Sequence, residues 1–231
     1  MGRGTEQSRW ERRRVKQKER QERSRQAIIQ AAIDEFGTTD FEAVTMDRIC
    51  ATHGISKGMM YHYFSNKDEL FLCCVSGIFQ ELWKYLSENM SIPEDEPIIE
   101  SLKRFFSLRE SFFQARDREK HIFENAVFYP PEHLAAKIQK YREPIHEQND
   151  RFLRQIVSRV RLRENLDQGK AIRYLNSIYQ LFWNALHQYC LPEEYHGFHS
   201  TLNDAEELLE MFLFGVIDRE QVENQHSQQT E

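Results

Sequence analysis

The chain contains few of the residues that interrupt helices or cross-link small scaffolds. Its 231 residues include 9 Gly, 6 Pro and 4 Cys. This low Gly and Pro content excludes collagen-like and Pro/Gly-rich disordered chains, and it leaves room for long helices. Four Cys without a CxxC pair do not form a disulfide framework, so we expect a reducing, cytoplasmic compartment.

Long apolar segments are missing as well. The longest tight apolar stretch, Phe212 to Ile217, is far shorter than the ~20 residues that a membrane-spanning helix needs. The N-terminus is rich in Arg and has no apolar core behind it, a pattern that predicts no secretory signal. We therefore expect a protein without a membrane partner.

Motifs of the common enzyme classes are absent too. The chain has no glycine-rich phosphate loop, no HExxH, no GxSxG and no coherent pair of nucleophile and base. A set of zinc-ligating residue types occurs late in the chain, at His187, Cys190, His196 and His199. Their spacing is not a standard zinc signature. We expect no catalysis, no metal and no cofactor.

The net charge of −6 is unevenly distributed. Residues 1–66 carry 12 Lys and Arg against 9 Asp and Glu, whereas residues 67–231 carry 19 against 28. An acidic body with a basic head suggests that only the head meets a polyanion. The most basic segment, residues 1–22, is interpreted as a flexible arm. It is either disordered or a polar extension of the first helix, and it either contacts DNA or is merely solvated.

Apolar residues recur at helical spacing through most of the chain, and no segment shows the alternation of a half-buried strand. We therefore predict an all-α protein. Ser65 with Asp68 resembles a capping box at the start of a long helix. The expected helices cover residues 27–36, 45–53, 56–64, 65–86, 98–113, 134–156, 167–189 and 201–219, with a shorter helical segment around 122–123 that ends at the prolines 130–131.

Residues 45–64 have the layout of a DNA-binding helix-turn-helix. Gly54 supplies the turn between two short helices, because glycine tolerates a positive φ. Cys50 provides a small side chain where the two helices cross, and Met60 is expected to pack the second helix onto the core. That second helix, Ser56 to Phe64, is predicted to enter the major groove.

The segment from Ile28 to Leu72 resembles the TetR (tetracycline-repressor-like) family of bacterial transcription regulators. Its sequence is IIQAAIDEFGTTDFEAVTMDRICATHGISKGMMYHYFSNKDELFL. The resemblance lies in AAxxxF of the first helix, TMxxI of the second, GISKGMMYHYF across the turn and third helix, and the following KDEL. Asp40 replaces the Gly that is usual in the family, and Cys50 replaces the usual Ala.

The resemblance implies a three-helix DNA-binding domain at residues 23–68, an effector-binding and dimerisation domain at 69–220, and a polar tail at 221–231. It implies a dimeric regulator of double-stranded DNA with a palindromic operator. Such a protein is most often a repressor that a small molecule releases. The alternative is a helical DNA-binding or interaction protein that needs no effector.

Family roles in DNA binding transfer onto matching residues. Thr45 and Lys67 resemble phosphate contacts, and Tyr61, His62 and Tyr63 resemble an aromatic cluster that mostly touches the DNA backbone. Packing in the core is the competing interpretation for Tyr63, and for Phe64 it is the favoured one. The start of the recognition helix resembles the part that faces the groove, at Ser56, Lys57, Gly58 and Met59.

The rest of the chain resembles the family only in architecture. Dimerisation is expected through helices at about 167–189 and 201–219, since the last helix has a wide apolar surface. Dense aromatic residues predict a pocket for an apolar or amphipathic effector. Glu124 is either a counter-charge for a cationic ligand or an exposed residue. The predicted pocket residues are Phe79, Trp83, Phe106, Phe113, Phe123, Tyr179 and Trp183.

Overall fold

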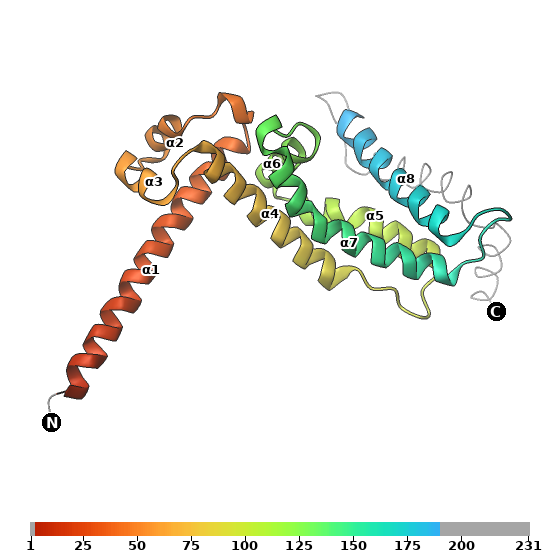
Figure 1. Cartoon of the computed structure of the whole chain (residues 1–231), viewed down its shortest axis with the longest axis horizontal. Coiled ribbons are helices and arrows are strands. Elements are labelled where there is room, and N and C mark those ends of the chain that lie inside the picture. Colours follow the sequence, from red (N-terminus) through yellow and green to blue (C-terminus); the bar gives the residue numbers. More distant parts are fainter. Residues whose placement is uncertain (1–2, 190–231) are drawn as a thin grey trace. The chain divides into compact units, whose positions relative to one another are not determined.

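The computed structural model describes residues 3–189 and the side chains of residues 15–181 (Figure 1). Every element in this part of the chain is helical, so the all-α prediction is confirmed there. The elements are α1 (Arg3–Phe36), η1 (Phe41–Ala43), α2 (Met46–His53), α3 (Lys57–Tyr63), α4 (Lys67–Asn89), α5 (Ile98–Phe113), α6 (Asp117–Phe128), η2 (Glu132–Leu134), α7 (Ala135–Arg159) and α8 (Gln168–Tyr189).

The expected helix at 201–219 and the tail at 221–231 lie outside the described residues. No helix within residues 3–189 is long and apolar enough to cross a membrane.

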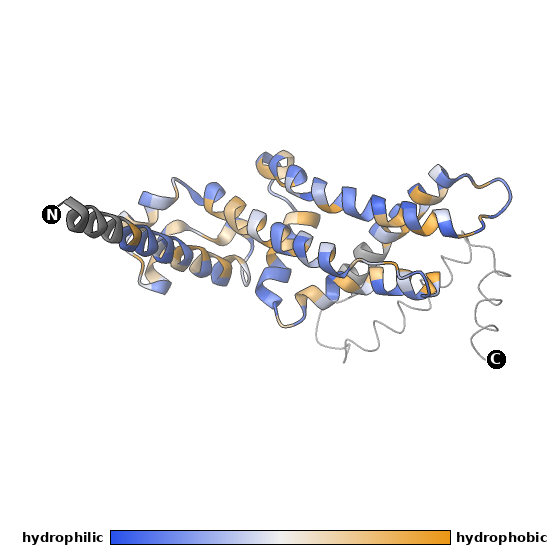
Figure 2. Cartoon of the chain, turned by 90° about the horizontal axis from the view of Figure 1, so that it is seen from below, coloured by the Kyte–Doolittle hydropathy of each residue, from blue (hydrophilic) through white to orange (hydrophobic). Residues whose placement is uncertain are grey.

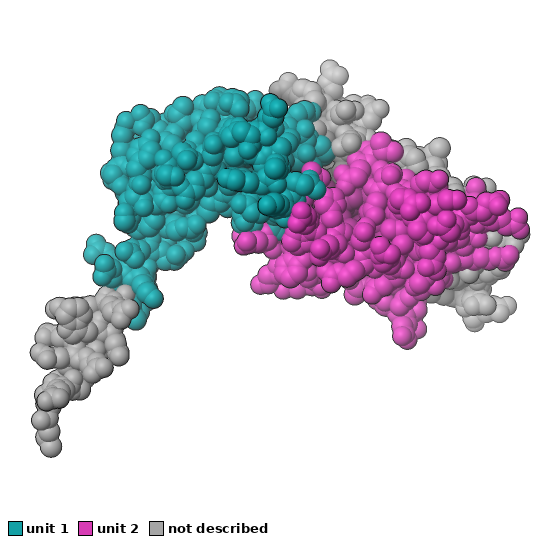
Figure 3. Space-filling model, viewed as in Figure 1, with its two compact units in different colours: residues 1–79, 115–141 teal, residues 80–114, 142–231 magenta. Residues whose placement is uncertain are grey.

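The chain divides into two compact units (Figure 3). One combines residues 1–79 with 115–141, and the other combines residues 80–114 with 142–231. The first unit contains the segment 23–68 that the sequence predicts as the DNA-binding domain. It is larger than that segment because it also includes α6, which packs against α1, and the first turns of α7.

Helix α1 is continuous from Arg3 to Phe36, so of the two alternatives for the basic segment the structure shows the polar extension of the first helix. Residues 15–23 are exposed and mainly hydrophilic (Figure 2), whereas Ile28 and Phe36 are buried. The exposed part is rich in Arg, Lys, Glu and Gln, which favour helices, and it contains neither Gly nor Pro. A helix nucleated in the core can therefore continue into solvent.

The predicted caps of the two short helices are confirmed. Thr45 Oγ1 accepts a hydrogen bond of 3.1 Å from the backbone N–H of Arg48, and Ser56 Oγ accepts one of 3.2 Å from that of Met59. Between them, Gly54 has a φ of 64° in the left-handed region. A side chain is strained in this conformation, which explains the glycine at the turn.

The predicted capping box of α4 is displaced by one residue. Asn66, rather than Ser65, caps the helix, because its Oδ1 accepts from the backbone N–H of Glu69 at 2.9 Å. Glu69 Oε2 in turn accepts from the backbone N–H of Ser65 at 2.8 Å. Asp68 takes no part in this exchange and instead pairs with His133 at 3.0 Å.

Three phenylalanines join the first helices of the unit. Phe71 on α4 contacts Phe36 on α1, with ring centroids 5.0 Å apart, and Phe41 on η1, with centroids 4.8 Å apart. All three are buried. Because removing a buried phenylalanine typically costs about 3–5 kcal/mol, this cluster holds the loop after α1 in place and so positions the start of α2.

Aromatic side chains also connect three helices of the second unit. The Phe105 ring on α5 stacks on Phe152 of α7, with centroids 4.8 Å apart. The same ring lies 4.9 Å from that of Tyr179 on α8. These contacts explain why aromatic residues at helical spacing on three separate segments are buried together.

Candidate nucleic-acid interface

Helix α3 presents one polar face to solvent over a buried anchor. Lys57 and His62 are exposed, and Tyr61 is 51% exposed, whereas Met60 and Phe64 are buried. The preference for Phe64 as a core residue is thus confirmed. Of the other predicted contacts, Thr45, Ser56 and Gly58 are exposed and Met59 and Tyr63 are half-buried.

The crossing of α2 and α3 is built around a small buried residue. Cys50 is buried, and its carbonyl accepts a hydrogen bond of 3.0 Å from the backbone N–H of Ile55, just after the turn at Gly54. Burial raises the pKa of the Cys50 thiol, and the charge of Asp47 raises it further. The residue is therefore a neutral packing group rather than a reactive thiolate.

Glycine at position 58 has no structural need within the protein. A Cβ atom built there has no neighbour within 4 Å, and its φ does not lie in the left-handed region. Glycine costs roughly 0.5–1 kcal/mol relative to alanine inside a helix. Open space over an exposed glycine fits the close approach of another molecule's backbone.

An exposed ion pair links the starts of α2 and α3. Lys57 Nζ lies 2.7 Å from Asp47 Oδ2, and both side chains are more than half exposed. The hydrogen bond to Asp47 raises the pKa of Lys57 and keeps it cationic. Because exposed ion pairs contribute little to stability, Lys57 can exchange Asp47 for an anionic partner at low cost. Sequence reasoning missed Asp47.

Lys67 has an internal partner that sequence reasoning missed. Its Nζ donates to the carbonyl of Phe41 at 2.8 Å and lies 4.1 Å from the centroid of the Phe41 ring. The side chain is half-buried and holds η1 against the start of α4. A phosphate contact by Lys67 stays a prediction, and it requires the ammonium to leave or share this carbonyl.

Two neighbouring carboxylates near the end of α1 face different helices. Glu35 is buried, and its Oε2 lies 2.7 Å from Nε of Arg48 on α2. Asp34 pairs with Arg118 of α6. Gly37 follows, and a Cβ atom there would come within 2.4 Å of the Arg118 Cβ. The close approach of α6 to α1 therefore requires glycine at position 37. Through these two ion pairs, the C-terminal end of α1 holds both α2 and α6.

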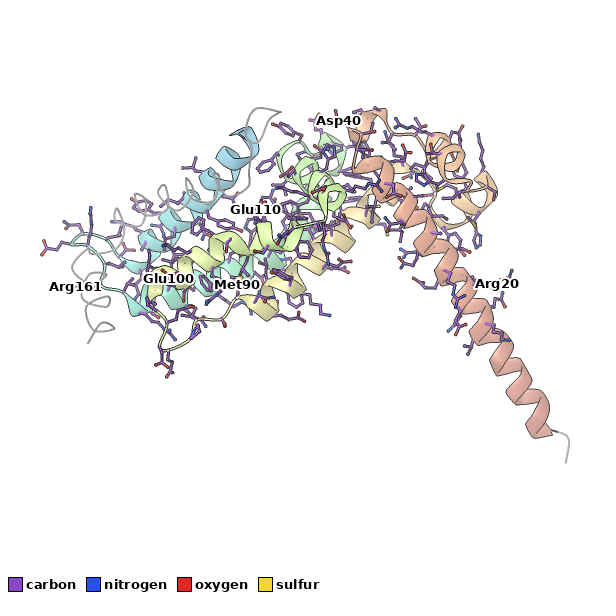
Figure 4. All side chains as sticks on the ribbon, turned by 180° about the vertical axis from the view of Figure 1, so that it is seen from behind. Arg20, Asp40, Met90, Glu100, Glu110 and Arg161 are labelled. Carbon is purple, nitrogen blue, oxygen red and sulfur yellow. The ribbon has the colours of Figure 1, made fainter. Side chains whose placement is uncertain are left out.

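The exposed part of α1 carries positive charge on one side. Lys16, Arg20 and Arg23 are exposed, and their spacing of four and three residues places them on one helical face (Arg20 is labelled in Figure 4). We call these three residues the basic stripe. Glu19 lies three residues after Lys16 and four before Arg23, so it borders this face, whereas Glu22 lies further around the helix.

The structure shows two contacts among the predicted pocket residues, one within each unit. Phe79 and Phe123 contact each other in the first unit, with ring centroids 5.2 Å apart. Phe106 and Tyr179 contact each other in the second, with centroids 5.5 Å apart. Helical spacing identifies an apolar face but does not say which helix will cover it. Of the remaining predicted residues, Phe113 is buried in the second unit, Trp83 is 40% exposed there, and the Trp183 side chain lies outside the described residues.

Metal ligands do not cluster within the described side chains, where no group of three His, Cys, Asp or Glu residues could hold an ion. The set of His187, Cys190, His196 and His199 lies outside them.

Comparison with known protein families gives two matches along the chain. Residues 28–74 match the model of bacterial regulatory proteins of the tetR family. Residues 96–212 match a model described as a tetracyclin repressor-like C-terminal domain. The first match includes both α2 and α3, and so it includes the exposed face of α3 described above.

Comparison with individual proteins also finds a transcriptional regulator. The HTH-type transcriptional regulator BetI of Rhizobium meliloti is 27% identical over 145 residues, which are 63% of each chain. The chain thus spans less than two thirds of this relative's length.

Solved structures share the fold. NalD, the secondary repressor of the MexAB-OprM multidrug efflux pump in Pseudomonas aeruginosa, superposes with a TM-score of 0.59 at 22% identity, over 87% of this chain and 99% of NalD. FadR from Bacillus subtilis, in complex with stearoyl-CoA, superposes with a TM-score of 0.61 at 17% identity, over 81% and 96%.

Proposed function

Because the chain belongs to the TetR family of bacterial regulatory proteins, we propose that it is a transcriptional repressor that a small-molecule effector releases from DNA. The observation that carries this proposal is the helix-turn-helix, with Lys57, Tyr61 and His62 exposed on α3 over the buried anchor Met60. Such a face is what a recognition helix needs to lie in the major groove.

Roles within this face follow from chemistry and exposure. Lys57 donates to guanine O6 and N7 or to a phosphate, and the open space over Gly58 lets the DNA come close. Tyr61, His62 and Tyr63 donate to the DNA backbone. The hydroxyl of Thr45 already accepts from the backbone at the start of α2, and its proton is left for a phosphate. Phosphate contacts fix the position of the protein, and base contacts select the operator.

A palindromic operator requires a two-fold axis, which we assign to a homodimer through α8 and the segment 201–219. Two large apolar side chains of α8 support this assignment. Tyr174 is 51% exposed and Leu181 is 58% exposed, and their spacing of seven residues places them on one helical face. Exposed apolar residues that share a face mark an interaction surface.

Release by a small molecule is supported by the kinds of protein that share the fold. NalD is named as a repressor, and the FadR structure holds stearoyl-CoA. An effector acts if it binds better to a state whose two recognition helices no longer fit adjacent grooves. The alternative is a DNA-binding or interaction protein without an effector, and a screen for ligands that reverse DNA binding distinguishes the two.

The test is a gel shift with DNA from immediately upstream of the protein's own gene, at fixed salt. We compare the wild type with Lys57→Ala/Tyr61→Ala, because Lys67 has a structural role. Lys137→Ala, an exposed lysine on α7, is the control. We expect palindrome-dependent binding by the wild type and the control, and its loss in the double variant. If a folded dimer binds neither this DNA nor any sequence selected from random DNA, the regulator proposal fails.

A further inference from the structure

Helix α1 carries positive charge on a part that does not contribute to the core. Among the described side chains of this helix, the first buried one is Ile28, and all of residues 15–23 are exposed. Arg20 lies on the part of α1 that projects beyond the short helices α2 and α3 (Figures 1 and 4). Packing within the protein therefore does not account for the residues found there.

The charge of this projecting part is concentrated and ordered. Residues 9–25 carry nine Lys and Arg against three Glu. Three of the cations form the basic stripe on one side of the helix, and Glu19 at its border offsets only a part of their charge. The sequence repeats the same helical spacing toward the N-terminus, since Arg13, Arg12 and Arg9 precede Lys16 by three, four and seven residues.

This order is unfavourable for a helix that is merely solvated. Lys16 and Arg20 are four residues apart, and Arg20 and Arg23 are three apart. Like charges at these two spacings repel each other and destabilise an isolated helix. Charges of alternating sign along one face would suit a solvated helix better. The stripe instead has the pattern of a surface for a polyanion, which removes the repulsion when it binds.

The stripe ends close to the point where α1 contacts α3. Two residues after Arg23, the Cζ atom of Arg25 lies 5.5 Å from the ring centroid of Phe64, the C-cap residue of α3. Nη2 of Arg25 also donates to Sγ of Cys73 on α4 at 3.1 Å. Helix α1 is continuous through this point. The stripe is therefore held in a fixed direction from the end of α3, and its surface continues the exposed surface of that helix.

The dimensions of the stripe suit a nucleic-acid backbone. Lys16 and Arg23 are seven residues apart, which corresponds to about 10 Å along a helix that rises 1.5 Å per residue. Each strand of duplex DNA carries one phosphate about every 3.4 Å along the axis. A strand that runs beside the stripe therefore presents about three phosphates to three cations.

An acidic lipid surface fits this segment less well. Helices that bind in a membrane interface have a broad apolar face opposite their charges. Val15 is the only apolar residue in the segment 15–23, and the exposed part of α1 is mainly hydrophilic (Figure 2). Charge without an apolar face favours DNA as the partner.

We propose that the basic stripe binds the DNA backbone next to the groove that α3 enters, as a second contact surface that does not read sequence. Lys16 pairs with a phosphate as a point charge, and Arg20 and Arg23 donate paired hydrogen bonds. The stripe contributes affinity and position, whereas selection of the operator stays with α3. This inference rests on the proposed function, because α3 brings the DNA to this unit.

The first experiment compares single charges on opposite sides of the same helix. Lys18 is exposed and lies two residues from both Lys16 and Arg20, which places it on the side of α1 opposite to the stripe. We measure operator binding by fluorescence anisotropy over a range of salt concentrations for the wild type, Arg20→Gln and Lys18→Gln. For Arg20→Gln, the slope of log affinity against log salt should fall by about 0.9 per bound protomer. The slope for Lys18→Gln should change less, and equal changes in the two variants would overturn the proposal.

The second experiment removes the whole stripe. Lys16→Gln/Arg20→Gln/Arg23→Gln should lower the slope by about 2.7 per protomer, because each of three phosphates contributes about 0.9. Its affinity should fall about tenfold or more, and by the same factor for the operator and for a scrambled duplex of equal length. A loss confined to the operator would mean that the stripe reads sequence, which contradicts the proposal.

The matched control removes three exposed charges elsewhere. Lys137→Gln/Lys140→Gln/Arg154→Gln changes the net charge by the same amount on α7, and it should leave the slope close to that of the wild type. Glutamine is a good helix former, so far-UV circular dichroism should show unchanged helix content in both triple variants. If the stripe variant does not fold, the comparison of Arg20→Gln with Lys18→Gln decides.

A second copy of the chain is the competing partner for the stripe. Residues 67–231 carry 19 Lys and Arg against 28 Asp and Glu, and so offer negative charge. Analytical ultracentrifugation at low salt without DNA should give the same mass for the wild type and the stripe variant. A lower mass for the variant would assign the stripe to contacts between copies and overturn the proposal.

Failure of this proposal can be separated from failure of the proposed function. A protein that selects its operator, with an unchanged salt slope in the stripe variant, retains the regulator proposal and loses this one. A protein that selects no operator, but whose stripe variant loses affinity for the scrambled duplex, gives the opposite result.

Discussion

Gly58→Ala should stabilise the free protein and weaken its binding to DNA. The added Cβ meets open space, and the residue lies in the first turn of α3 with an ordinary helical φ. Replacing glycine by alanine in a helix gains roughly 0.5–1 kcal/mol. For a chain of this size the gain corresponds to a rise of about 1–4 °C in melting temperature. In the complex, the same methyl group fills the space through which the DNA backbone approaches.

Gly77→Ala is the matched control. Gly77 is inside α4, and a Cβ atom there also has no neighbour within 4 Å. Both variants should therefore gain similar stability in chemical denaturation, while only Gly58→Ala should lose affinity in a fluorescence anisotropy titration at fixed salt. Equal operator affinities of the two variants would refute the close approach at α3. A loss of stability in Gly58→Ala would show that the space is not open.

Three further perturbations separate structural from DNA-binding roles. Lys67→Met removes the charged hydrogen bond to the carbonyl of Phe41 and the contact with its ring, so denaturation without DNA should show a loss of about 1–2 kcal/mol. Changing the basic stripe to Gln should reduce the salt dependence of operator binding without changing the preferred sequence, and an unchanged slope means a merely solvated extension. The hydrogen bond from Arg104 lowers the pKa of Glu96. Its stabilising effect is therefore complete above the unfolded-state pKa of Glu96 and disappears as the pH falls through the lowered value. Glu96→Gln should flatten the dependence of the melting temperature on pH in that acidic range.

Local rules are sufficient to predict the helix-turn-helix. The caps at Thr45 and Ser56 and the turn at Gly54 depend on side chains within three or four residues of their partners, so their spacing is visible in the sequence. The same rules fail by one residue at α4, because Ser65 and Asn66 are both good caps and follow each other. The choice between them depends on Glu69, whose backbone N–H donates to Asn66 and whose carboxylate accepts from Ser65.

Partners distant in sequence cannot be predicted in this way. Lys67 finds the carbonyl of Phe41, which lies 26 residues earlier, and Lys57 finds Asp47, which lies ten residues earlier. Neither pair has a helical spacing. The sequence does not decide between the two alternatives for the extension of α1, for a different reason. Its Arg, Lys, Glu and Gln residues suit a solvated helix as well as a disordered arm, and only continuity with the buried core at Ile28 favours the helix.

The unit that contains the DNA-binding helices extends beyond the segment 23–68, and this has a consequence for regulation. Asp34 of α1 pairs with Arg118 of α6, and the adjacent Glu35 pairs with Arg48 of α2. Because helices move largely as rigid bodies, a displacement of α6 acts on the same turn of α1 that holds α2. Under the proposed function, an effector needs only to favour a different position of α6 to alter how α2 and α3 are presented to DNA. The close contact of Arg118 with Gly37 makes this connection stiff rather than loose.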